Sequence, residues 1–223
     1  IIKHFKEYNL QTEKQSFNYH AFENKESDIV WKNFKNIHLK SYTLGWSPLK
    51  SVVGEIIHVS YGYEDDYNGL NVKDKIVLVN AGVKPNYKAI HRSEKYKYAC
   101  ENGAIGFVQY HPEQGGIIQI GTIALECEIG TIPALSISYE SAMSLIDFKI
   151  NKNETPILEI YSNNIEKDIT SFNSIGFKKA SIDTDEEIII CGHQDCWFNS
   201  VGAFDNGSGI ALVIELARQL KDY

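Results

Sequence analysis

The fold of this chain is decided by the stretch Ile188-Ile-Ile-Cys-Gly-His-Gln-Asp-Cys-Trp-Phe-Asn-Ser-Val-Gly-Ala-Phe-Asp-Asn-Gly-Ser-Gly209. Its first three residues are apolar and β-branched, which is typical of a central parallel strand that is buried on both faces. Polar residues follow where that strand should end. Ligand sites of open α/β sheets form at this carboxyl edge, so we expect the chemistry of the protein here.

Three side chains in this stretch are candidates for a metal site. A neutral imidazole at His193 can bind a metal through one ring nitrogen. Asp195 lies two residues on, so in an extended backbone it points the same way and can accept the other ring N–H. Asp205 precedes Asn206-Gly-Ser-Gly209, whose glycines allow backbone angles that other residues resist, and a carboxylate there could bridge two cations. The run 210–220 then predicts a buried helix, because it is apolar around most of its circumference.

Each candidate also has an ordinary structural interpretation. A lone histidine after a strand is usually a hydrogen-bonded structural residue, Asp195 could be a turn or cap residue, and Asp205 could be an N-cap. The three residues in this order favour a metal site, and the glycines after Asp205 favour a ligand over a simple cap. A zinc knuckle built on Cys191, His193 and Cys196 is disfavoured, because no second Cys/His pair lies nearby.

These residues resemble the co-catalytic dizinc aminopeptidase family, whose relatives include glutamate carboxypeptidase II and the transferrin receptor ectodomain. The family pattern is a strand, His-x-Asp, a short connection, and Gly-Ala-x-Asp-(Asp/Asn)-Gly-(Ser/Ala)-Gly before a helix. It appears here as His193-Gln-Asp195 and Gly202-Ala-Phe-Asp205-Asn-Gly-Ser-Gly209. The resemblance implies that His193 binds one zinc ion, that Asp205 bridges two, and that Asp195, the candidate catalytic residue, orients a metal ligand.

The resemblance implies a zinc-dependent aminopeptidase that removes N-terminal residues from peptides through a metal-activated water. It also implies further ligands and a general-base Glu-Glu pair beyond Tyr223. The pair Glu186-Glu187 precedes the expected strand. At about 3.3 Å per residue it would lie about 20 Å from His193, so it is not that base. Two or three protein ligands are too few for a closed zinc site, so we expect this chain alone to be inactive.

A second functional class stays open beside the enzyme. One branch of the relatives keeps this fold without metals, so the alternative is a non-catalytic, receptor-like or protein-binding module. Retention of His193, Asp195 and Asp205 favours the enzyme. The sequence does not distinguish an aminopeptidase from a carboxypeptidase or a dipeptidase, and it does not give the preferred residue at the cleavage site.

The middle of the chain resembles the protease-associated (PA) domain, a small β-rich fold inserted into several peptidases. The matching segments are Val72-Lys-Asp-Lys-Ile-Val-Leu-Val79, Ala99-Cys-Glu-Asn-Gly-Ala-Ile-Gly-Phe-Val108 and Ile132-Pro-Ala-Leu-Ser-Ile-Ser138, with helices expected at 87–101 and 139–148. The insert could be structural, or it could cover the cleft and restrict the size of the substrate.

The predicted fold class is α/β, a partial three-layer αβα zinc-exopeptidase sheet interrupted by this β-rich insert. Residues 1–45 are predicted as the N-terminal part of the peptidase lobe, 46–150 as the PA domain and 151–223 as the first part of the zinc peptidase core. Such a partial sheet exposes apolar surface, so we expect self-association or binding of the missing C-terminal part of the peptidase domain.

Composition narrows the partners. The 43% of hydrophobic and 12% of aromatic residues argue for a folded core. The net charge of −7 disfavours nucleic acid and anionic membrane surfaces. A peptide substrate is what the resemblance to the aminopeptidase family implies. No apolar run approaches the roughly 20 residues that cross a bilayer.

The compartment is not determined by the sequence. The chain begins Ile1-Ile-Lys without Met or a signal peptide, so we expect that its original N-terminus was removed or not included. Cys100 and Cys127 could form a disulfide in an oxidising compartment, and the sequence does not decide whether they do. A cytoplasmic location is slightly favoured over secretion.

Overall fold

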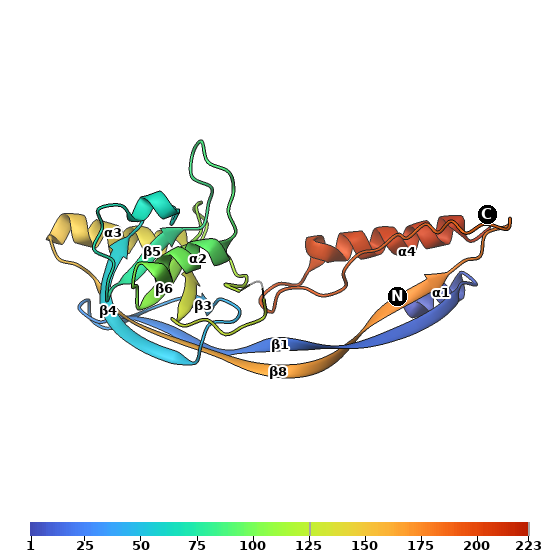
Figure 1. Cartoon of the computed structure of the whole chain (residues 1–223), viewed down its shortest axis with the longest axis horizontal. Helices are drawn as coiled ribbons and strands as arrows, with labels where there is room; N and C mark the ends of the chain where they lie inside the picture. The colour runs from blue at the N-terminus through green and yellow to red at the C-terminus, as the bar shows by residue number, and fades with distance from the viewer. Residues whose placement is uncertain (125, 223) are drawn as a thin grey trace. The chain divides into compact units, whose positions relative to one another are not determined.

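The computed structural model of the chain describes residues 1–124 and 126–222. It contains two compact units, one made of Ile1–Tyr19 with Asp168–Tyr223 and the other of His20–Lys167. The division falls inside two long strands, β1 (Gln11–Trp31) and β8 (Ile157–Phe177) (Figure 1). The predicted domain limits 1–45, 46–150 and 151–223 stay a prediction. The two units are defined by contacts within the chain, and this definition does not test the limits of family domains.

The unit His20–Lys167 is built on a mixed sheet. The strand order is β2-β1-β8-β4-β5-β6-β7-β3. Strands β4 to β7 run parallel to one another, whereas β3 is antiparallel to β7 and β8 is antiparallel to β4. The bounds of its further elements are β2 Ile37–Leu39, β3 Ser41–Thr43, β4 Lys50–His58, η1 Glu64–Tyr67, β5 Ile76–Asn80, α2 Arg92–Glu101, β6 Gly106–Tyr110, β7 Ala134–Ile137 and α3 Tyr139–Lys152.

Two cores cover the two faces of this sheet. Val77 and Val79 of β5 belong to one core together with Tyr96 of α2. Ile76 and Leu78 of the same strand belong to the other core, which includes residues of α3. Because successive side chains of a strand point to opposite faces, α2 and α3 pack on opposite sides of the sheet (Figure 1). The predicted α/β class is therefore confirmed.

The helix starts in this unit follow from capping. The sequence predicts a helix from residue 87, but α2 begins only at Arg92, because the side chain of His91 accepts a hydrogen bond from Ser93 N and caps the helix there. Ser138 caps α3 in the same way by accepting from Ser141 N. Helix α3 continues to Lys152, beyond the predicted end at 148.

The unit of Ile1–Tyr19 and Asp168–Tyr223 carries the motif region. It contains α1 (Ile2–Glu7), the outer parts of β1 and β8, a π-helical turn η2 (Ala203–Ser208) and α4 (Gly209–Leu220). In the described part of the chain, no helix is both long and apolar enough to span a membrane.

Two expectations about this unit are wrong. The run Ile188–Ile190 is not in a strand, and Ile188 is 90% exposed. Helix α4 is apolar along one side but contains no buried residue. Both have one cause, because a central strand exists only through hydrogen bonds to its neighbours. Within the described residues no strand pairs with Ile188–Ile190, so the parallel sheet that α4 was expected to cover is not formed.

Candidate metal centre

The three predicted site residues meet in the structure. Nδ1 of His193 lies 3.0 Å from Oδ1 of Asp195, and Nε2 of the same ring lies 3.0 Å from Oδ1 of Asp205. The backbone oxygen of Asp195 is also 3.2 Å from Nδ1. All three side chains are exposed to solvent. The imidazole therefore lies between two carboxylates. Asp195 is two residues away in the same loop, and Asp205 comes from the η2 turn.

Glycines let the two loops approach each other. A Cβ atom on Gly192 would lie 3.1 Å from Nδ2 of Asn206, and one on Gly209 would lie 2.2 Å from Oδ1 of the same side chain. The side chain of Asn206 thus fills the space that a Cβ atom at Gly192 or Gly209 would need. It follows Asp205 directly, so its packing beside Gly192 brings Asp205 to His193.

The predicted reason for the glycines after Asp205 is wrong, because neither Gly207 nor Gly209 has a positive φ. Gly209 has an ordinary right-handed backbone, with φ of −65°, so it is needed for space and not for unusual angles. The left-handed position is Gly202, with φ of +61°, where a Cβ atom would also lie 2.6 Å from Cβ of Cys196. The peptide bond between Asp205 and Asn206 is cis.

A further residue of the motif holds the histidine loop in place. Gln194, the middle residue of His-x-Asp, donates from Nε2 to the backbone oxygen of Phe172 on β8 at 3.0 Å. Sequence reasoning missed Gln194 and the packing of Asn206. The signal for Asn206 was present, because an asparagine among small residues is typical of a tightly packed turn.

The donor atoms fit two positions of one zinc ion. Imidazole and carboxylate ligands lie about 2.0–2.2 Å from zinc, so two of them on a tetrahedral ion are about 3.3–3.6 Å apart. Nε2 of His193 and Oδ1 of Asp205 are 3.0 Å apart, which is a direct hydrogen-bonding distance and falls a few tenths of an ångström short of this range. The contact between Nδ1 and Asp195 corresponds to the partner that usually orients a ligating histidine. The described residues contain no group of three or more His, Cys, Asp or Glu side chains arranged for a metal.

The electrostatics of the site favour a cation between these carboxylates. Desolvation lowers the pKa of His193. The hydrogen bonds to the backbone and side chain of Asp195, with the charges of Asp195 and Asp205, outweigh it and raise this pKa above its usual value. The same negative potential that holds a proton on the ring attracts a metal ion to Nε2 once that proton is lost.

The alternative interpretations fare differently. Asp205 is not the N-cap of α4, since that position is Ser208 and α4 has no side-chain cap. Asp195 contacts His193, which a simple turn residue would not need to do. All four cysteines lie in the described part of the chain and are free, so Cys100 and Cys127 are unpaired. The roles assigned to His193, Asp195 and Asp205 stay a prediction.

Comparison with known proteins gives two matches along the chain. Residues 162–223 match peptidase family M28, and residues 51–145 match the PA domain. Aminopeptidase YwaD from Bacillus subtilis (strain 168) is 28% identical over 173 residues, which cover 77% of this chain and 34% of that protein. The two predicted resemblances, to a peptidase and to a PA domain, are confirmed.

Solved structures share the fold. A peptidase M28 precursor from Shewanella amazonensis SB2B superposes with a TM-score of 0.79 at 21% identity, over 100% of this chain and 53% of that one. A zinc aminopeptidase from Bacillus subtilis superposes with a TM-score of 0.70 at 22% identity, over 99% of this chain and 50% of that one. The chain thus spans about a third of the curated relative and about half of these structures.

Proposed function

We propose that this chain, a member of the dizinc aminopeptidase family with an inserted PA domain, is part of a zinc-dependent aminopeptidase that releases N-terminal residues from peptides. One observation carries the proposal. Within the segment that matches peptidase family M28, Nε2 of His193 and Oδ1 of Asp205 lie 3.0 Å apart, a separation suited to two ligands of one zinc ion.

The chain's own residues have separate roles in this proposal. His193 offers Nε2 as one ligand, and Asp195 holds the ring by accepting from Nδ1–H, which fixes the tautomer. Asp205 has a second carboxylate oxygen, through which it would bridge to a second ion. Bound zinc would supply a Lewis acid that polarises the scissile carbonyl of the peptide.

The donor count limits what this chain does by itself. His193 and Asp205 supply two donors, and catalytic zinc normally takes three from the protein. We therefore propose that the chain alone is inactive and that activity belongs to the whole protein. The function of that protein as a peptidase is supported by the name of its curated relative, an aminopeptidase.

An assay on the whole protein tests this function. The substrates are leucine p-nitroanilide and its N-acetylated form, which lacks the free amino group of an aminopeptidase substrate. We expect release of p-nitroaniline only from the free amine, its loss on chelation and its return with zinc. His193→Ala should abolish activity, and Asp195→Asn should lower it roughly 10- to 100-fold. Asp185→Asn, an exposed carboxylate of the same segment, is the matched control.

The controls separate the two functional classes. Hydrolysis of both substrates would indicate an endopeptidase or a contaminant. A whole protein that is folded and hydrolyses neither substrate, with or without zinc, would contradict the enzyme and favour the non-catalytic binding module. Full activity of His193→Ala would show that the assigned site is wrong even if the protein is a peptidase.

A further inference from the structure

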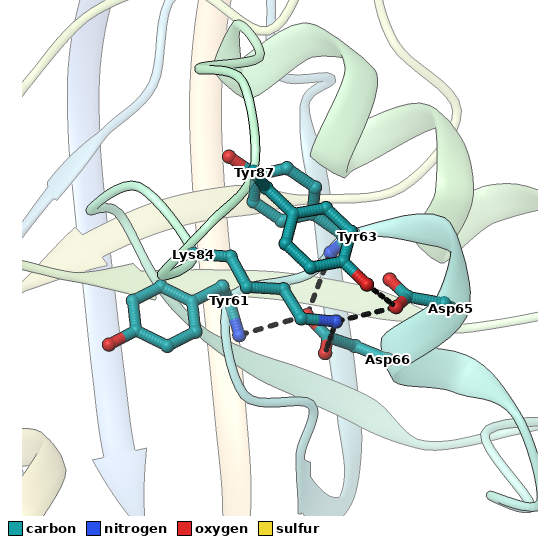
Figure 2. A network of polar contacts seen from close by, with 6 residues as sticks. All are labelled: Tyr61, Tyr63, Asp65, Asp66, Lys84 and Tyr87. Carbon is teal, nitrogen blue, oxygen red and sulfur yellow. Dashed lines mark hydrogen bonds and ion pairs between the residues drawn. The ribbon is translucent and has the colours of Figure 1, made fainter.

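The segment 81–91, which joins β5 to α2, is attached to the rest of its unit mainly through charged and aromatic side chains. Figure 2 shows Lys84 of this segment pointing between Asp65 and Asp66 of the short helix η1. The distances from its Nζ are 2.7 Å to Oδ2 of Asp65 and 2.8 Å to Oδ1 of Asp66. This attachment belongs to the PA-like region and has no part in the candidate metal centre.

The surroundings of Lys84 form a cage for an ammonium group. Its Nζ lies 4.3 Å from the ring centroid of Tyr87 and 6.0 Å from that of Tyr63, so both aromatic faces contribute cation–π attraction. The Tyr87 hydroxyl donates to Oδ2 of Asp65 at 2.5 Å. The hydrogen bonds to Asp65 and Asp66 raise the pKa of Lys84, so this ammonium stays charged.

The carboxylate of Asp66 in this cage is held by groups other than Lys84. Oδ2 of Asp66 accepts from the backbone N–H groups of Tyr61 and Tyr63, at 3.2 and 3.0 Å. The side chain of Asp66 is only 7% exposed, whereas that of Lys84 is 19% exposed. The carboxylate of Asp66 therefore keeps two backbone hydrogen bonds when Lys84 is displaced.

The base of the segment is held by a different lysine. Lys95 of α2 is 2% exposed and donates from Nζ to the backbone oxygens of Asn80 and Gly82, at 2.9 and 2.7 Å. Asn80 in turn accepts from Gly82 N through its side chain at 2.7 Å. The backbone N–H of Ala81 also donates to Tyr110 of β6. These contacts tie the base of the segment to α2 and to the inner strand β6, so the base stays in place when the tip moves.

We propose that residues 81–91 form a strap that Lys84 holds closed on η1 and that opens beyond Gly82 while Lys95 keeps its base fixed. Tyr87 and Ile90 of the strap form one side of a surface depression of about 440 Å³, whose other lining residues include Glu64, Asp65 and Tyr98. Opening of the strap changes this depression, because it removes Tyr87 from Asp65 and from the Tyr63 ring.

Amide hydrogen exchange measured by NMR on the 223-residue chain tests the strap. The first reporter is the N–H of Tyr87, whose bond to Lys84 O closes a turn that the Lys84 and Tyr87 side chains both hold to Asp65, so release of Lys84 frees this turn. The second is the N–H of Ala81, which is bonded at the base of the strap. Lys84→Met keeps the aliphatic stem and removes the charge. We expect exchange at Tyr87 to rise at least tenfold, because a hydrogen bond to a charged group contributes at least about 1.4 kcal/mol, and we expect exchange at Ala81 to stay unchanged.

Controls distinguish local opening from general destabilisation. Lys97→Met removes an exposed lysine of α2 that pairs with Glu101, and it should change neither reporter. In the unmodified chain, raising the salt concentration screens the Lys84 pairs and should speed exchange at Tyr87 but not at Ala81. This second measurement holds even if Lys84→Met does not fold. Unchanged exchange at Tyr87 in both experiments, or an equal rise at both reporters, would overturn the strap.

Discussion

Nε2 of His193 lies 3.0 Å from Oδ1 of Asp205, although the two residues come from different loops. The arrangement places two metal-binding atoms of different chemistry, an imidazole nitrogen and a carboxylate oxygen, at a spacing suited to one zinc ion. The carboxylate of Asp195 contacts the other ring nitrogen, Nδ1. The histidine is therefore oriented before any metal binds.

Calorimetric zinc titration of the whole protein and of this chain tests the ligand assignment. We expect two tightly bound ions per whole chain and weak binding to this chain, because His193 and Asp205 leave most coordination positions to water. In the whole protein His193→Ala should remove one ion, and Asp205→Ala should weaken both. If Asp205→Ala bound two ions as tightly as the unmodified protein, the bridging role would be wrong.

Substitution of Gly209 tests how the loops are brought together. Gly209→Ala replaces glycine in α4, which by helix propensity alone favours the helix by about 1 kcal/mol. Its Cβ atom would lie 2.2 Å from Oδ1 of Asn206, so Asn206 must move and carry Asp205 with it. We expect circular dichroism to show an intact helix while zinc affinity in the whole protein falls roughly tenfold, the range seen when ligand positioning is lost. Unchanged affinity would show that Asn206 does not position Asp205.

The buried Lys95 predicts a pH dependence of stability. Desolvation lowers its pKa from 10.5 to about 8, with Arg92 adding to the effect and Asp66 opposing it. Between these pH values the unfolded chain binds more protons than the folded chain, so the free energy of unfolding should rise with pH across the window. The rise amounts to about 3 kcal/mol at most. Denaturant unfolding of the unmodified chain and of Lys95→Met, at pH 7 and pH 10, isolates this contribution by difference. A difference that is constant with pH would contradict it.

The apolar surface around the motif predicts association. Large hydrophobic side chains are strongly exposed at Ile188, Ile189, Val201, Phe204 and Leu212. Soluble monomers rarely expose apolar patches of this kind, so we propose that the isolated chain self-associates or binds the remaining part of the peptidase domain. Light scattering over a wide concentration range should show a mass that grows with concentration, and Ile189→Lys with Phe204→Lys should reduce it. A constant monomer mass would contradict the proposal.

The sequence alone was sufficient to predict features whose interacting groups are close together in the chain. The apolar run 76–79 lies in a segment that resembles the PA domain, and the structure places it in β5, between α2 and α3. The contact between His193 and Asp195 follows from their spacing of two residues in an extended backbone. The glycine pattern around Asp205 likewise marked a tight turn before a helix.

Only the tertiary structure determined the features that depend on residues far apart in the sequence. The run Ile188–Ile190 has the composition of a central strand, but pairing comes from neighbouring strands, which the described residues do not supply. The approach of Asp205 to His193 required the packing of Asn206 beside Gly192, which no periodicity reveals. Lys84 looks like any surface lysine in the sequence. Its role arises because the fold brings Asp65 and Asp66 to it, and burial and ion pairing depend on the surroundings of a residue rather than on its type.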